Sequence, residues 1–138
     1  MNRVPLFILL TVLLSCWDSP KDKIRDTILY DDSVGYWNYE WPRERAEFYG
    51  MTFEFNSKGK VKQYSFDKME NKRNLFSDYG MAPRLEWGVA NDSIFTWMNY
   101  NSKIKVVKYN QDTIWLFDQG QNRSSMLIRL KGNLNIEK

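Results

Sequence analysis

Few side chains in this sequence are of the types that carry out chemistry. The 138 residues include no histidine and one cysteine, which excludes Ser-His-Asp triads, Cys-His pairs and histidine-based metal sites. Carboxylate pairs remain, such as Glu40 with Glu44, but the sequence does not frame the cleft that a glycosidase-like pair needs. The Asp31-Asp32 pair lacks the spacing of a calcium loop, and the isolated glycines form no phosphate-binding loop. We therefore expect a protein that is not an enzyme and that holds no metal and no cofactor.

The one cysteine, Cys16, stands at the end of an apolar run. Arg3 supplies a basic flank, and residues 5–14 form an apolar stretch of about ten residues, which matches a signal-peptide core and is too short to cross a bilayer. The letters LLSC that end at Cys16 resemble the bacterial lipobox, whose cysteine receives a thioether-linked diacylglyceryl group and becomes the first residue of the mature chain. The alternative is an ordinary signal peptide followed by an unrelated cysteine.

The lipobox resemblance implies how the chain is organised and where it is located. It implies a lipoprotein signal peptide over residues 1–15 and a lipidated N-terminus with a polar tether over residues 16–33. Two or three acyl chains, such as palmitate, would hold the exported protein on the cell membrane or the outer membrane. With its only thiol acylated, the rest of the chain has no disulfide and is long enough for one domain. The net charge of +3 comes from interspersed acids and bases, which does not favour nucleic acid as a partner.

Beyond the tether, apolar and polar residues alternate with a period of two, which is typical of β-strands. Turn residues recur about every ten positions, and this spacing indicates an all-β antiparallel meander in a sandwich or barrel. We expect little helix and about eight strands, over residues 35–41, 51–55, 60–66, 84–89, 92–98, 103–109, 112–117 and 124–131. Residues 67–83 are expected to be a long connection. The alternatives are a disordered insertion or a ragged edge strand around Leu75 and Phe76.

Two motifs lie at the ends of the meander: the first strand opens with Gly35-Tyr36-Trp37, and Arg129 lies in the last strand. They resemble the motifs of the short lipocalin-like domains found in lipoproteins of Bacteroidetes-type bacteria. The resemblance covers residues 34–131 and implies a small barrel followed by a tail over residues 132–138. In that family the tryptophan packs across the closed end of the barrel and the arginine lies over its ring, a cation–π contact worth about 0.5–2 kcal/mol. Gly35, Trp37 and Arg129 would thus close the barrel.

The chain also departs from the lipocalin pattern. True lipocalins have a helix after the eighth strand, whereas the tail here is short and rich in asparagine, and the family's Thr-Asp-Tyr motif is missing. These departures leave a barrel filled by its own side chains as an alternative to a deep ligand cavity.

Four aromatic residues are candidates for a ligand or partner face. The stretches DSIFTWM and DTIWLF are apolar at successive positions, so both faces of these strands are expected to be covered. Either the connection over residues 67–83 covers one face, or a patch is left for a partner or an apolar ligand. We expect Trp97 and Trp115 to line one face with the neighbouring Phe95 and Phe117.

The sequence therefore predicts a membrane-anchored, non-enzymatic binding module of the cell envelope. Its ligand would be a small apolar molecule or a protein partner. The alternative is a filled barrel that acts only by protein contact, as an accessory subunit or an inhibitor.

Overall fold

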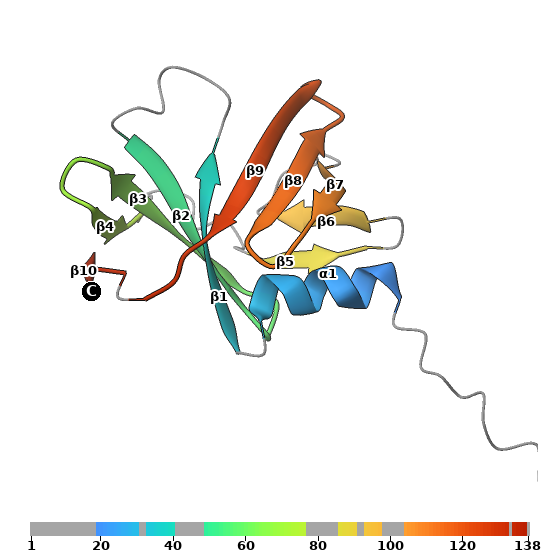
Figure 1. Cartoon of the computed structure of the whole chain (residues 1–138), viewed down its shortest axis with the longest axis horizontal. Coiled ribbons are helices and arrows are strands. Elements are labelled where there is room, and N and C mark those ends of the chain that lie inside the picture. Colours follow the sequence, from blue (N-terminus) through green and yellow to red (C-terminus); the bar gives the residue numbers. More distant parts are fainter. Residues whose placement is uncertain are drawn as a thin grey trace, which may run out of the picture.

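The fold is known from a computed structural model, which describes residues 19–30, 33–40, 49–76, 86–90, 93–97, 104–132 and 134–137. It contains one helix and ten strands among these residues (Figure 1). Their bounds are α1 Pro20–Leu29, β1 Val34–Glu40, β2 Tyr49–Asn56, β3 Val61–Asp67, β4 Lys72–Leu75, β5 Trp87–Val89, β6 Ile94–Trp97, β7 Ile104–Tyr109, β8 Thr113–Asp118, β9 Arg123–Arg129 and β10 Ile136–Glu137.

All ten strands belong to one sheet, in the order β10-β4-β3-β2-β1-β9-β8-β7-β6-β5. Every pairing is antiparallel except that of β10 with β4, so the predicted all-β class with little helix is confirmed. The eight predicted strands correspond to β1–β3 and β5–β9, in the predicted chain order.

The sheet is not closed into the barrel that we expected. At one edge β5 has three residues, and the residue before it, Glu86, forms one isolated bridge with Lys60 in the turn between β2 and β3. At the other edge β4 and β10 extend the sheet beyond β3. Among the described residues, no ladder joins these two edges, because β5 is short and meets a turn rather than a strand.

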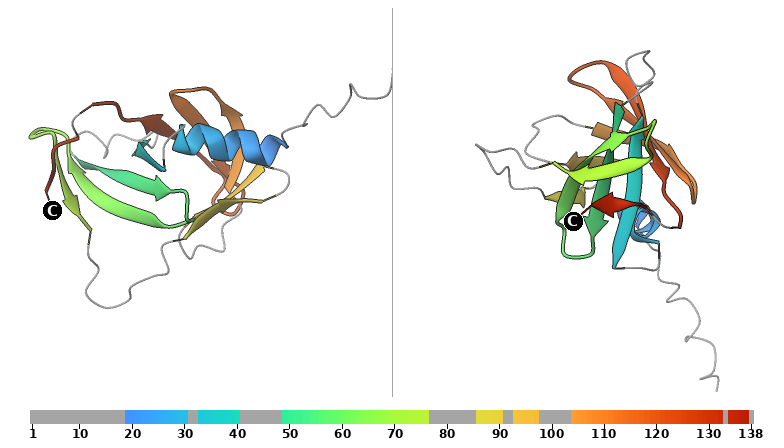
Figure 2. Two further views of the ribbon diagram at one scale, coloured as in Figure 1. Left: turned by 90° about the horizontal axis from the view of Figure 1, so that it is seen from below. Right: turned by 90° about the vertical axis from the view of Figure 1, so that its left-hand side faces the viewer.

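The sheet is nevertheless strongly curved around the helix. Helix α1 packs against β1 and β2 near the middle of the sheet and also against the edge strand β5 (Figure 2). The inner face carries the buried aromatic and aliphatic side chains that the period-two pattern predicts. The ring of Phe55 lies edge-on to those of Trp87, at 5.4 Å, and Phe95, at 5.7 Å. This geometry is the favourable one for aromatic pairs.

Helix α1 lies where a polar tether was predicted, so the tether prediction is wrong over Pro20–Leu29. Ser19 is the N-cap, Pro20 occupies the first turn, and the side-chain oxygen of Ser19 accepts a hydrogen bond from the backbone N–H of Asp22. Three apolar side chains spaced along one side of the helix are buried in the core: Ile24, Ile28 and Leu29. The folded unit therefore includes α1, before residue 34.

Two further segments are more ordered than expected. Strand β4 lies inside the predicted connection over residues 67–83 and includes Leu75, where the alternative placed an edge strand, although β10 pairs beyond it. Residues 77–85 are outside the described part. The predicted tail over residues 132–138 contributes β10. The chain leaves β9 at Leu130, whose backbone N–H donates to the carbonyl of Tyr36 on β1, and β10 then pairs with β4. The segment between them therefore crosses the outer side of the sheet. It acts as a cover for polar side chains on β2 to β4.

Candidate functional site

The end of α1 meets the first and ninth strands at a joint formed by Tyr30, Gly35, Trp37 and Arg129, which we call the helix-end joint. The indole Nε1 of Trp37 donates to the carbonyl of Ile28 at 2.9 Å, and the guanidinium of Arg129 donates to the carbonyl of Thr27. The last carbonyls of a helix have no partner within the helix and carry its negative dipole end. An indole N–H and a cationic guanidinium are therefore well suited to this position.

The guanidinium of Arg129 is held between two aromatic rings. Its Cζ lies 4.7 Å from the ring centroid of Trp37 and 4.0 Å from that of Tyr30. Burial lowers the pKa of Arg129, which nearby Asp112 partly opposes, and the group remains a cation at neutral pH. Its Nη1 is buried without a hydrogen-bond acceptor among the described residues, so the stacking carries much of the interaction.

Gly35 is required for this joint. A Cβ at this position would overlap the carbonyl oxygen of Ile28 and would lie 3.1 Å from the indole nitrogen of Trp37. Only glycine lets the helix end approach β1 so closely. The structure thus brings together the three residues that were predicted to share a structural role, and the Trp37–Arg129 contact is present. The joint connects neighbouring strands β1 and β9 to α1 and does not close a barrel.

The predicted aromatic face is not one face. Phe95 is 1% exposed and belongs to the inner core, whereas Ile114 and Leu116 are the core residues of β8. Because side chains alternate along a strand, Trp115 and Phe117 point to the outer side of the sheet. Trp97 is in β6 opposite Trp87, but its side chain is outside the described part, so its predicted position beside Trp115 is untested.

The outer side of β7, β8 and β9, which we call the outer face, combines aromatic and cationic side chains. Cross-strand pairing places Trp115 beside Lys108, whose Nζ is 5.1 Å from the indole centroid. Phe117 lies opposite Lys105 in the backbone register of β7 and β8. The register shifts between Val106 and Lys108, and the extra residue Val107 is left 64% exposed.

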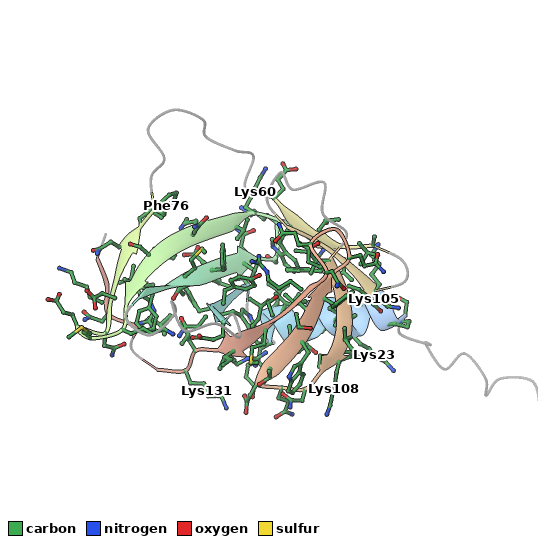
Figure 3. The ribbon with its side chains drawn as sticks, turned by 90° about the horizontal axis from the view of Figure 1, so that it is seen from above. Lys23, Lys60, Phe76, Lys105, Lys108 and Lys131 are labelled. Carbon is green, nitrogen blue, oxygen red and sulfur yellow. The ribbon has the colours of Figure 1, made fainter. Side chains whose placement is uncertain are left out.

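Lys108 of this face points to the same side of the molecule as two other lysines. Figure 3 shows Lys23 of α1, Lys108 and Lys131 pointing to one side, whereas Lys60 and Phe76 lie on the other. The carboxylates near the outer face are already engaged. Asp112 pairs with Lys131 at 2.9 Å, and the side chain of Asp118 accepts hydrogen bonds from two backbone N–H groups of the following turn. The outer face is therefore cationic and partly apolar.

A second group of polar residues, which sequence reasoning missed, lies on the outer side of β2 and β3. Glu54 is buried, accepts a hydrogen bond from the hydroxyl of Tyr64 at 2.6 Å and pairs with Lys62 at 2.9 Å. Burial, followed by the hydrogen bond to Glu54, raises the pKa of Tyr64 well above its ordinary value. The alternating pattern of β2 and β3 could have located this group, because Glu54 and Lys62 are predicted on facing strands.

Arg73 of β4 extends this polar group under the C-terminal segment. It is 4% exposed, and burial lowers its pKa. Its Nε donates to the hydroxyl of Thr52 at 3.0 Å, its Nη1 donates to the carbonyl of Leu134 at 2.9 Å, and its Cζ lies 4.0 Å from the ring centroid of Phe66. The guanidinium of Arg73 therefore forms its hydrogen bonds within the protein. The arrangement stabilises the sheet edge and presents no activated nucleophile or base to solvent.

The described residues contain no cluster of metal-ligating side chains. Within the same residues, no helix has the length and apolar character needed to cross a bilayer. Cys16, the predicted lipid attachment site, lies outside the described part of the chain. In comparisons with protein-family models, curated proteins and solved structures, none matches this chain.

Proposed function

We propose that this protein is a lipid-anchored domain of the bacterial envelope that works by surface contact. The proposal that the protein works by surface contact rests mainly on the position of α1. Its residues Ile24, Ile28 and Leu29 pack into the same core as Phe55 and Trp87, on the inner face where a lipocalin would hold its ligand. A concave face occupied by the protein's own helix favours contact with a partner over enclosure of a small apolar molecule.

The resemblance to lipocalin-like domains supports the same proposal in part. The antiparallel meander and the stacking of Arg129 on Trp37 agree with it. The open sheet and the helix before β1 are differences, and both remove space or enclosure from a ligand cavity. In this proposal the lipocalin-like features serve the stability of the domain, and the outer face provides the contact.

The proposed absence of enzymatic activity is supported by how the polar groups are used. Glu54 is committed to Tyr64 and Lys62, and Arg73 is committed to Thr52 and the C-terminal segment. A general acid or base needs a side chain that can reach a substrate. These buried groups instead satisfy one another.

Native mass spectrometry of the full chain, produced in a bacterium that acylates lipoproteins, tests the proposal. We expect the acylated protein to carry no stoichiometric small molecule and to bind no added benzene. The Ile28→Ala variant is the positive control, because removing this buried helix side chain opens an apolar cavity of the size that admits benzene. A stoichiometric ligand on the unaltered protein would instead establish the small-molecule binder.

A further inference from the structure

We propose that the outer face of β7, β8 and β9 rests on the anionic surface of the membrane that carries the anchor. This inference deepens the proposed function and rests on the lipid attachment at Cys16. The occupant of the face is a layer of anionic phospholipid headgroups.

The composition of the outer face fits a membrane interface. Trp115 and Phe117 are half-buried, Val107 projects from its bulge, and Lys105 and Lys108 are exposed beside them. Indole and lysine side chains suit the headgroup region, because each has an apolar body and a polar or charged end. The same mixture is less suited to bulk water, where the apolar surface would remain exposed.

The charge of the face selects an anionic partner. Neither Lys105 nor Lys108 forms an ion pair with another described residue, and the nearby carboxylates of Asp112 and Asp118 have partners within the protein. No described carboxylate therefore pairs with Lys108, whose Nζ lies 5.1 Å from the ring centroid of Trp115. Each lysine near an anionic leaflet strengthens binding about fivefold, so two lysines contribute a factor of about thirty.

The length of chain between the anchor and the fold makes such a contact hard to avoid. Only Trp17 and Asp18 separate Cys16 from the N-cap Ser19, so the Cα atoms of Cys16 and Ser19 are at most about 11 Å apart. Helix α1 therefore begins close to the headgroups, and Lys23 near its start points to the same side as Lys108 (Figure 3). At this short range a contact that is weak in solution becomes largely occupied, because its effective concentration is high.

Site-specific fluorescence on the acylated full chain tests this orientation. Because Cys16 is acylated, a cysteine introduced at Val107 or at Phe76 is the only thiol available to an environment-sensitive dye. Both positions are exposed, at 64% and 51%, and Phe76 lies on the side away from Lys108. The labelled proteins are placed in vesicles of phosphatidylcholine alone or with about one third phosphatidylglycerol, together with a headgroup-level quencher.

We expect the dye at position 107, and not at position 76, to be quenched in the anionic vesicles. The Lys105→Gln/Lys108→Gln variant should lower the ratio of docked to undocked protein about thirtyfold. The matched variant Lys58→Gln/Lys60→Gln, in the turn on the other side, should leave it unchanged.

Three outcomes would overturn the proposal, and mass spectrometry of the same sample shows whether the diacylglyceryl group is present. If the diacylglyceryl group is present but both dyes remain equally exposed, docking is wrong and anchoring stands. If the dye at position 107 is protected in native membranes but not in anionic vesicles, the occupant is an acidic protein and not the lipid surface. If the diacylglyceryl group is absent, the anchoring fails and the docking proposal fails with it.

Discussion

Replacing Gly35 with alanine should destabilise the domain far more than the same change elsewhere in the sheet. The added methyl group would overlap the backbone carbonyl oxygen of Ile28, and backbone atoms cannot rotate away as a flexible side chain can. The end of α1 would have to move away from β1. This movement would lengthen the hydrogen bond from Trp37 to Ile28 and loosen the packing of the helix.

The expected loss follows from these two effects. Overpacking a tightly packed site costs about 1–3 kcal/mol, and weakening a buried hydrogen bond costs about 1 kcal/mol more. We therefore expect Gly35→Ala to lower the free energy of unfolding by about 2–4 kcal/mol. The control is Gly88→Ala in β5, where the nearest atom to the new Cβ is the hydroxyl oxygen of Thr96, at an ordinary 3.4 Å. Since alanine is the better residue in a strand, Gly88→Ala should be neutral or stabilising by up to about 1 kcal/mol.

Urea unfolding of the full chain in a mild detergent, followed by tryptophan emission, measures both changes. The midpoint should fall for Gly35→Ala and stay or rise for Gly88→Ala, with equal slopes in denaturant. Equal stability of the two variants would refute the view that Gly35 is needed for the close approach of α1.

Two further predictions concern Arg129 and Tyr64. Arg129→Lys keeps the charge but loses the planar group stacked between Tyr30 and Trp37. We therefore expect urea unfolding to show a free energy of unfolding lower by about 1–2 kcal/mol. An unchanged free energy of unfolding would show that the charge alone suffices. Burial and the hydrogen bond to Glu54 raise the pKa of Tyr64. The contribution of its protonated hydroxyl to the free energy of unfolding is therefore complete below pH 10. This contribution is lost as the pH rises further, by up to about 1.4 kcal/mol per pH unit for one proton. Tyr64→Phe should therefore be less stable at pH 8 but should decline less steeply between pH 10 and 11. A parallel decline in both proteins would contradict this account of Tyr64.

The strands were predictable because their hydrophobic residues alternate and their turns are polar. The β2–β3 hairpin shows this directly, since Phe53 and Phe55 alternate with polar neighbours and Gly59 adopts the positive φ that its turn requires. The same alternation explains why the aromatic face was only partly predicted. Trp115 and Phe117 occupy outward positions, whereas Phe95 occupies an inward one, and local composition does not reveal the phase of each strand.

The helix was missed because its charged residues outnumber its apolar ones. A signal was present in the N-cap Ser19, the following Pro20 and the spacing of Ile24, Ile28 and Leu29. These three apolar residues become meaningful only when the curved sheet supplies a surface to bury them. Closure of the sheet could not be predicted from the strand pattern, because it depends on which edges meet in space.

Docking of the outer face depends on the proposed attachment of the protein to a membrane through Cys16. Mass spectrometry of the N-terminal peptide, taken from protein isolated from the membranes of an acylating bacterium, tests it most directly. We expect a mature chain that begins at Cys16 and carries the mass of a thioether-linked diacylglyceryl group. A mature chain that begins at another residue, or a Cys16 with a free thiol, would contradict this attachment.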